Sequence, residues 1–188
     1  VRQALWRWGH NRLLWSEKSD RKFLITGYQK PCYLPSLLLT NCRSIINKSD
    51  DLLLNVNITN PSIIAITETW LTDKITDNFV YIPNYIVFRC DRLNRKGGGV
   101  AMFITNSKQS HILKFPFTCN TELEHIWSIY DNSVAICVVY IPPGLSVNIN
   151  SDIINYLSMC IDHINCNYNY KIIICWNRCN RRILDWNQ

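Results

Sequence analysis

The sequence predicts an α/β domain in which helices connect neighbouring parallel strands. Two segments carry the signal, over residues 37–66 and 134–175, and each holds an apolar run, a one-sided apolar helix and a second apolar run. The length of 188 residues, with 47% hydrophobic residues, suits one domain with a sizeable core. Parallel strands joined by a helix end at the same edge of the sheet, which is where open α/β sheets bind ligands.

The first strand–helix–strand unit begins with the apolar run Leu37–Leu39, which leads into the polar Asn41. Ser44 is a candidate cap for the helix that follows, and Asn60 with the proline after it ends that helix. The next apolar run leads into Glu68. Because the two strands are expected to be parallel neighbours, Asn41 and Glu68 should lie at one edge of the sheet.

The middle of the chain predicts antiparallel strands, followed by a second crossover. The four strands expected here are Tyr85–Phe88, Val100–Ile104, Ile126–Tyr130 and Val134–Tyr140, the last two joined as a hairpin. Ser151 is the candidate cap of a second helix, and Lys171–Cys175 is the strand after it. Tyr140 therefore joins Asn41 and Glu68 at the expected ligand-binding edge.

Three strand ends thus present polar side chains that could bind a metal ion or a phosphate. The carboxylate of Glu68 and the amide of Asn41 offer oxygen atoms, which Mg²⁺ prefers as ligands. The hydroxyl of Tyr140 is suited to hydrogen-bond a phosphate. Each residue also has an ordinary structural role: a solvated acid, a turn cap or a packed ring.

The overall charge and the cysteines bear on the kind of partner and on the compartment in which the protein is expected. The net charge of +6 favours a polyanionic partner without requiring one. Nine cysteines without C-x-x-C spacing predict reduced, intracellular thiols. The sequence shows no signal peptide and no membrane-spanning stretch, so secretion and a membrane partner are not expected. Residues 1–33 are predicted to be an N-terminal extension of unassigned role, and residues 34–188 to be the domain.

Four short elements, in order along the chain, resemble one known family. They are N-x-R-S-x-x-N-K at 41–48, T-E-T-W-L at 67–71, a run from I-P-N-Y at 82–85 through R-C-D-R at 89–92 to K-G-G-G-V-A at 96–101, and Y-I-P-P at 140–143. Together they resemble the endonuclease domain of non-LTR (LINE-type) retrotransposons. That domain belongs to the endonuclease/exonuclease/phosphatase superfamily, on the branch akin to apurinic-site endonucleases.

The resemblance implies a four-layer α/β sandwich with two mixed sheets between helices. It implies Mg²⁺-dependent nicking of DNA in the nucleus, which primes reverse transcription by a reverse transcriptase domain of the parent element. Glu68 would bind the metal, Asn41 would support it and Tyr140 would hold the scissile phosphate. The candidates for contacts to the DNA backbone are Arg43, Arg92, Arg95 and Lys96.

The last element of the family pattern, G-D-F-N, is degraded in this chain. Trp176 stands in place of the glycine, Asn177 in place of the aspartate, and Cys179 in place of the asparagine, which Asn180 recovers if one residue is inserted. Asn177 cannot accept a proton as the aspartate would. The closing S-D-H element is absent before Gln188, so the C-terminal strands are expected to be missing and the sheet edge beside the last strand exposed. The sequence therefore predicts a truncated copy with little or no activity.

Two other functions fit the same residues. A non-catalytic remnant would still bind DNA through its basic residues. A phosphatase of inositol lipids or a sphingomyelinase-like enzyme would share the superfamily, but T-E-T-W-L and G-G-G-V-A resemble the retrotransposon branch. The glycines at 97–99 either let the backbone approach DNA or only permit a turn with positive φ.

Overall fold

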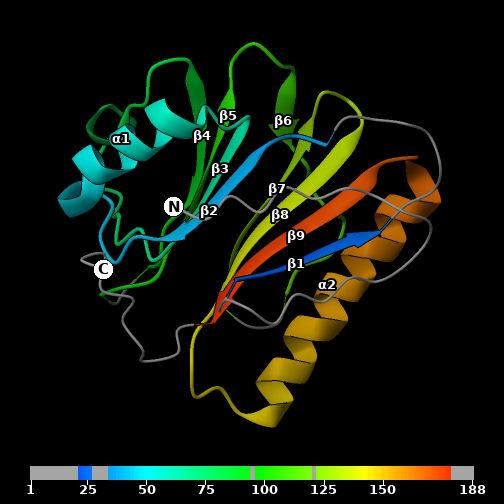
Figure 1. The fold of residues 1–188 in the computed structure, drawn as a ribbon. Coiled ribbons are helices and arrows are strands. Elements are labelled where there is room, and N and C mark those ends of the chain that lie inside the picture. The colour runs from blue at the N-terminus through cyan, green and yellow to red at the C-terminus, as the bar shows by residue number, and fades with distance from the viewer. Residues whose placement is uncertain (1–20, 27–33, 94–95, 120–121, 179–188) are drawn as a thin grey trace.

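A computed structural model of the chain describes residues 21–26, 34–93, 96–119 and 122–178, and it contains two mixed β-sheets stacked face to face (Figure 1). The five-stranded sheet has the order β1 (Arg21–Thr26), β9 (Lys171–Arg178), β8 (Val134–Ile141), β7 (Glu124–Tyr130) and β6 (Ser110–Ile112). The four-stranded sheet has the order β2 (Leu37–Asn41), β3 (Ile63–Thr67), β5 (Val100–Thr105) and β4 (Tyr85–Cys90).

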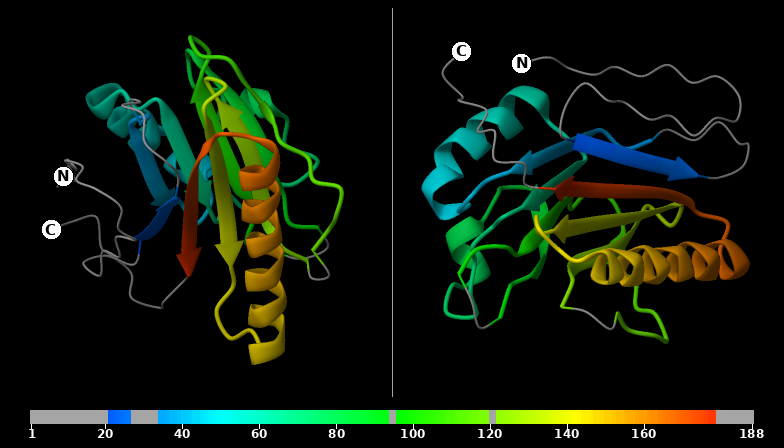
Figure 2. Two further views of the ribbon diagram at one scale, coloured as in Figure 1. Left: turned by 90° about the vertical axis from the view of Figure 1, so that its right-hand side faces the viewer. Right: turned by 90° about the horizontal axis from the view of Figure 1, so that it is seen from below.

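Helices cover the outer faces of the two sheets, which gives the four layers that were predicted (Figure 2). Helix α1 (Ser49–Thr59) follows the short 3₁₀ turn η1 (Ile46–Lys48) and packs on the four-stranded sheet, together with a second turn, η2 (Asp77–Val80). Helix α2 (Val147–Asn167) packs on the five-stranded sheet. Among the described helices, none is long and apolar enough to cross a membrane.

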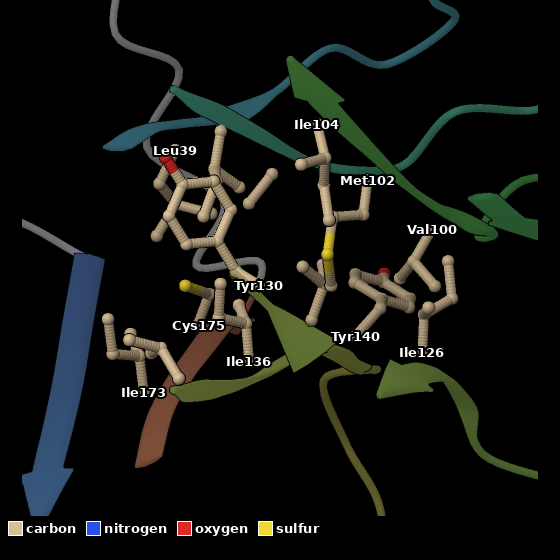
Figure 3. Packing of buried hydrophobic residues seen from close by; sticks show 14 residues of the cluster. Leu39, Val100, Met102, Ile104, Ile126, Tyr130, Ile136, Tyr140, Ile173 and Cys175 are labelled. Carbon is tan, nitrogen blue, oxygen red and sulfur yellow. The ribbon is translucent and has the colours of Figure 1, made fainter. Parts of the chain in front are cut away.

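The central core lies between the two sheets (Figure 3). It is built by alternate residues of the strands, because successive side chains of a strand point to opposite faces. Ala65 and Met102 of one sheet meet Ile136 and Cys175 of the other, and all four are almost completely buried. Tyr140 belongs to this core and is only 3% exposed. The polar residues at the strand ends therefore sit at the rim of a dry interior.

Both predicted crossovers are confirmed. Strand β2 pairs parallel with β3, and Asn41 is in register with Thr67. Strand β8 pairs parallel with β9, and Tyr140 is in register with Asn177. The predicted hairpin is also confirmed, since β7 and β8 are antiparallel. Helix α1 ends where the sequence predicts, at a left-handed Asn60 with φ +40°.

Both predicted helix caps are wrong. Ser44 lies before η1 with φ +88°, and its backbone N–H donates to the carbonyl of Glu68. The N-cap positions of η1 and α1 are Ile45 and Lys48, and neither makes a side-chain cap hydrogen bond. Helix α2 begins earlier than predicted, because the Ser146 side chain accepts a hydrogen bond of 3.3 Å from the N–H of Ile149. Ser151 therefore lies inside α2.

Strand β1 occupies the edge that was expected to be exposed. It falls within the predicted N-terminal extension and pairs antiparallel with β9, from Arg21 opposite Asn177 to Thr26 opposite Ile172. Strand β9 is thus paired on both sides, with β8 and with β1. The expectation of an unpaired edge at the last strand is wrong, since β1 pairs with β9 there and is the outermost strand of this sheet among the described residues.

Candidate functional site

The predicted polar residues gather at one edge of the two sheets, where β2, β3 and β8 end. Asn41 lies two positions after Leu39 and Thr67 two positions after Ala65, both members of the core between the sheets, so both side chains project toward the opposite sheet. Tyr140 approaches from that opposite sheet. The site is therefore built from both sheets.

The turn that carries Glu68 is held in an unusual backbone conformation by the loop before α1. Glu68 has φ +58° and Trp70 has φ +55°, which side-chain-bearing residues seldom adopt. The backbone N–H groups of Ser44 and Ile45 donate to the carbonyls of Glu68 and Thr69, at 2.9 and 3.0 Å. These hydrogen bonds stabilise the turn and orient the carboxylate.

The glycine loop holds the same turn from the other side. The N–H of Trp70 donates to the carbonyl of Gly98 at 3.0 Å, and the N–H of Thr69 to that of Gly99 at 3.3 Å. Gly98 in turn donates its own N–H to Glu68 Oε2, at 3.1 Å. The Nε1–H of Trp70 donates to the same oxygen. Glu68 as a residue is only 8% exposed, and its carboxylate is fixed by two donors.

The glycines at 97–99 are needed for the backbone of the site to fold as it does. All three have positive φ, from +69° to +87°. A Cβ on Gly98 would lie 2.3 Å from Arg92 Cζ, and one on Gly99 would lie 2.5 Å from Thr69 Oγ1. Both the turn and the close approach of these side chains therefore require glycine.

An ion pair joins the two sheets beside this turn. Arg92, in the loop after β4, donates Nη2–H to Glu124 Oε2 at 3.0 Å and also donates Nε–H to Oε1. Both side chains are nearly buried, at 11% and 7% exposure. The Arg92 guanidinium also lies 5.4 Å from the centre of the Tyr140 ring. The hydrogen bonds to Glu124 raise the pKa of Arg92 above its ordinary value, with the charge of Glu68 adding to the effect.

Glu124 was not singled out from the sequence. It lies two positions before Ile126, the predicted start of its strand, so the alternation of β7 turns it inward. It is also in register with Tyr140. Extending the alternation backward by one period would have found it.

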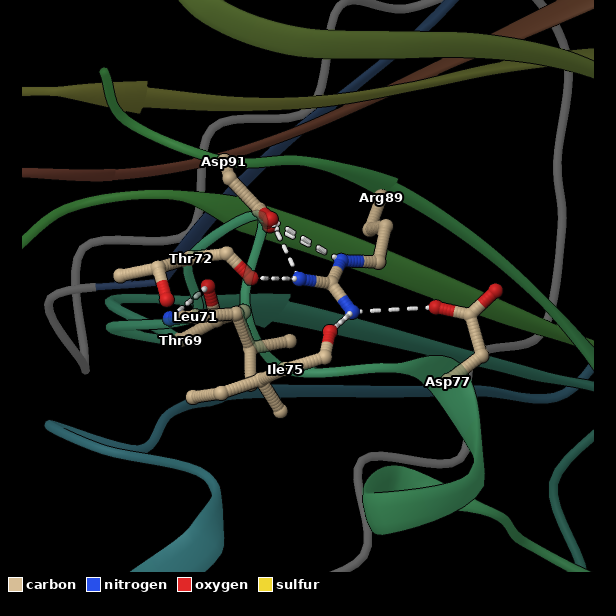
Figure 4. A network of polar contacts seen from close by, with 7 residues as sticks. All are labelled: Thr69, Leu71, Thr72, Ile75, Asp77, Arg89 and Asp91. Carbon is tan, nitrogen blue, oxygen red and sulfur yellow. Dashed lines mark hydrogen bonds and ion pairs between the residues drawn. The ribbon is translucent and has the colours of Figure 1, made fainter.

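Arg89 anchors the loop that follows the Glu68 turn (Figure 4). It binds Asp91 through Nε and Nη2, and its Nη1 donates to Asp77 at 3.0 Å. It also donates to the carbonyls of Thr72 and Ile75, at 2.8 and 2.7 Å. Within the resembled R-x-D-R element, Arg89 and Asp91 thus support the loop rather than face a ligand.

The oxygen donors at the edge fit a hard cation. Within the described residues, Asn41 Oδ1 and Thr67 Oγ1 are buried and have no hydrogen-bond partner. A buried polar atom left unpaired is costly, and a cation beside Asn41 would satisfy it. No cluster of three or more Asp, Glu, His or Cys side chains that could bind a metal occurs in the described part of the chain. The fit therefore rests on one carboxylate and one amide, with water expected to complete the shell of a Mg²⁺ ion.

The predicted DNA-contact residues separate into two groups. Arg43 and Lys96 are exposed, in the two loops that bind the Glu68 turn. Lys96 Nζ lies 6.0 Å from the centre of the Trp70 ring. Arg92 faces Glu124 and Tyr140 instead. Arg95 and Asn180 lie outside the described residues, and Asn177 is placed only through the backbone of β9.

No family model and no curated protein matches the sequence significantly. Solved structures do match the fold. The 3′ phosphatase NExo from Neisseria, bound to a product DNA hairpin, superposes with a TM-score of 0.59 at 16% identity, over 77% of this chain and 57% of that one. The human Nocturnin catalytic domain superposes with a TM-score of 0.55 at 14% identity, over 84% of this chain and 67% of that one.

An AP endonuclease from Archaeoglobus fulgidus has a TM-score of 0.51 at 14% identity, over 71% of this chain. The chain spans 52% of the length of that endonuclease and 57% of the Neisseria enzyme. At such identities the likeness concerns the fold alone. With its two stacked mixed sheets between helices, the chain has the endonuclease/exonuclease/phosphatase fold.

Proposed function

We propose that this chain is a DNA-nicking endonuclease domain of a non-LTR retrotransposon whose activity is strongly reduced. The observation that carries the proposal is the Glu68 carboxylate, which two donors fix at the same edge of the sheets as the buried, unpaired Asn41 Oδ1. Oriented oxygen donors of this kind suit Mg²⁺. The likeness of the fold to a DNA-bound phosphatase and an AP endonuclease supports DNA as the substrate.

Each residue of the site would have its own role in phosphodiester hydrolysis. Glu68 and Asn41 would hold the ion, which as a Lewis acid stabilises charge on a phosphoryl oxygen. Tyr140 would donate a hydrogen bond from its hydroxyl to another phosphate oxygen. Arg92 lies over the Tyr140 ring and would add positive charge near a phosphate held there. Arg43 and Lys96, with Arg95, would contact the DNA backbone, which positions a protein without reading sequence.

The reduced activity follows from Asn177. In β9 it lies beside Tyr140, where the resemblance expects an aspartate. An amide cannot take a proton from the attacking water. The proposal includes a reverse transcriptase domain in the parent element and a nuclear place of action, because the nick serves to prime synthesis on chromosomal DNA.

Asn177→Asp is expected to raise Mg²⁺-dependent nicking of supercoiled plasmid by at least about tenfold, since a positioned general base contributes roughly 10²–10⁴-fold. The matched control is Asn57→Asp, the same change of charge at an exposed position of α1. An equal rate in both variants would contradict the role given to position 177.

The dependence on Glu68 tests the site itself. In the Asn177→Asp background, Glu68→Gln keeps the shape of the side chain and removes its charge, so nicking is expected to fall to the level seen with EDTA. Nicking that survives Glu68→Gln would place the chemistry elsewhere. Nicking by the native chain that is as fast as nicking by Asn177→Asp, and that is lost in Glu68→Ala, would show that its activity is not reduced as proposed.

DNA binding without cleavage is the second candidate, favoured by exposed Arg43 and Lys96 on both sides of the Glu68 turn. It predicts that the native chain retains plasmid DNA at low salt and releases it as salt rises, because phosphate contacts release counterions. Retention that is unchanged in the double variant Arg43→Ala, Lys96→Ala would exclude these two contacts.

A further inference from the structure

Trp70 has a role at Glu68 that its position in the sequence does not explain. The residue is 37% exposed, so it counts among the exposed large hydrophobic residues rather than the core, and its backbone adopts φ +55°. The strained turn brings the indole Nε1–H onto Oε2 of the residue two positions earlier. A residue held in such a conformation usually serves the site that it borders.

The hydrogen bonds of Glu68 fall on one oxygen only. Oε2 accepts from the indole of Trp70 and from the backbone N–H of Gly98. Among the described residues, none donates to Oε1. The two carboxylate oxygens are therefore unequal: one is occupied by the protein and the other is left for a ligand.

We infer that Trp70 is a positioning residue that occupies Oε2 and thereby presents Oε1 of Glu68 to the cation as a single-oxygen ligand. The inference rests on the proposed function, which places the cation at Glu68. Groups that hydrogen-bond a metal-binding side chain fix its orientation, and their loss typically costs 10–100-fold in metal affinity. A carboxylate that donates one oxygen suits the compact octahedral shell of Mg²⁺, whereas Ca²⁺ accepts both oxygens of a carboxylate.

Lys96 supports this arrangement. Its ammonium group lies 6.0 Å from the centre of the Trp70 ring, within reach of a cation–π interaction. Gly97 follows it, and a Cβ there would lie 3.7 Å from Trp70 Nε1. The glycine loop therefore contacts both the ring of Trp70 and the carboxylate that the ring holds.

The test measures metal binding directly, by the free Mn²⁺ signal in electron paramagnetic resonance, with Ca²⁺ as competitor. Trp70→Phe keeps an aromatic ring and removes the donor. The matched control is Trp127→Phe, because Trp127 is 2% exposed and its Nε1 has no hydrogen-bond partner among the described residues. Glu68→Gln reports whether the ion binds at Glu68 at all.

Trp70→Phe is expected to weaken Mn²⁺ binding by about tenfold and to shift the selectivity toward Ca²⁺, because the released carboxylate can turn to offer both oxygens. Trp127→Phe is expected to change neither. If Glu68→Gln abolishes binding while Trp70→Phe behaves like Trp127→Phe, the role of Trp70 is disproved and the proposed site stands. If Glu68→Gln leaves binding unchanged, the proposed site fails, and the inference fails with it.

A second measurement does not depend on the folding of Trp70→Phe. In the ¹⁵N-labelled chain, one of the seven indole N–H signals should be broadened strongly by Mn²⁺, and the same signal should move upfield in Glu68→Gln as its acceptor is weakened. If no indole signal responds to saturating Mn²⁺, Trp70 does not hold the metal ligand.

Discussion

Glu124→Ala is expected to lower the free energy of unfolding by about 3 kcal/mol, since removing one partner of a buried ion pair leaves the other charge unpaired. The partner left unpaired would be Arg92, which is only 11% exposed and lies over the buried ring of Tyr140. The pair also joins the two sheets, because Glu124 belongs to β7 and Arg92 follows β4. Urea unfolding, followed by tryptophan fluorescence, measures the loss.

The double variant Arg92→Met, Glu124→Leu separates the pair itself from the cost of breaking it. Apolar side chains of similar size replace buried ion pairs with little loss of stability. We expect the double variant to recover most of the loss, so that the two changes are strongly non-additive. A double variant no more stable than Glu124→Ala would show that the charges do not act as a pair.

Arg89→Ala is expected to have an effect of similar size, again about 3 kcal/mol, because it strips a nearly buried Asp91 of its partner. It also removes the donors to the carbonyls of Thr72 and Ile75. Arg89→Lys should recover only part of the stability, since an ammonium group lacks the planar fork that serves several acceptors at once.

An ion pair at the surface, between Lys108 and Asp131, provides the control for Arg89→Ala. Lys108 Nζ lies 2.9 Å from Asp131 Oδ2, and both side chains are almost half exposed. Lys108→Ala should leave the midpoint of urea unfolding unchanged, because solvent screens such pairs. If Arg89→Ala shifts the midpoint no more than Lys108→Ala does, the network in Figure 4 does not stabilise the loop.

The sheet framework could be predicted because its signals are local. The apolar runs that became β2 and β3 flank one helix, and a connection of that kind makes the two strands parallel neighbours. The same argument placed Asn41 and Glu68 at one edge. Strand β6 has only three residues, and β1 pairs with a strand about 150 residues away, so neither leaves a periodic signal that a local pattern can reveal.

The details of the site depend on contacts that no local pattern encodes. Glu68 receives its hydrogen bond from Gly98 across 30 positions, and Arg92 meets Glu124 across 32. The hydrogen bond from the Trp70 indole to Glu68 forms within a turn in which both residues have positive φ. The predicted Ser44 cap failed for the same reason, since the backbone there bends to serve the Glu68 turn. The sequence identified the residues that could bind a ligand, whereas the residues that orient them became visible only in the structure.

The pairing of β1 with β9 imposes an order on the folding of the chain during its synthesis. The four-stranded sheet uses only residues 37–105, so it can assemble while the remainder is still being translated. The five-stranded sheet places an early segment against the last described strand, and β1 must wait for β9 to leave the ribosome. During that interval residues 21–26 lack the strand that they pair with among the described residues, and unpaired strands are sites of aggregation. Slow translation should therefore lower the yield of folded protein, and a chaperone that binds nascent residues 21–26 should raise it.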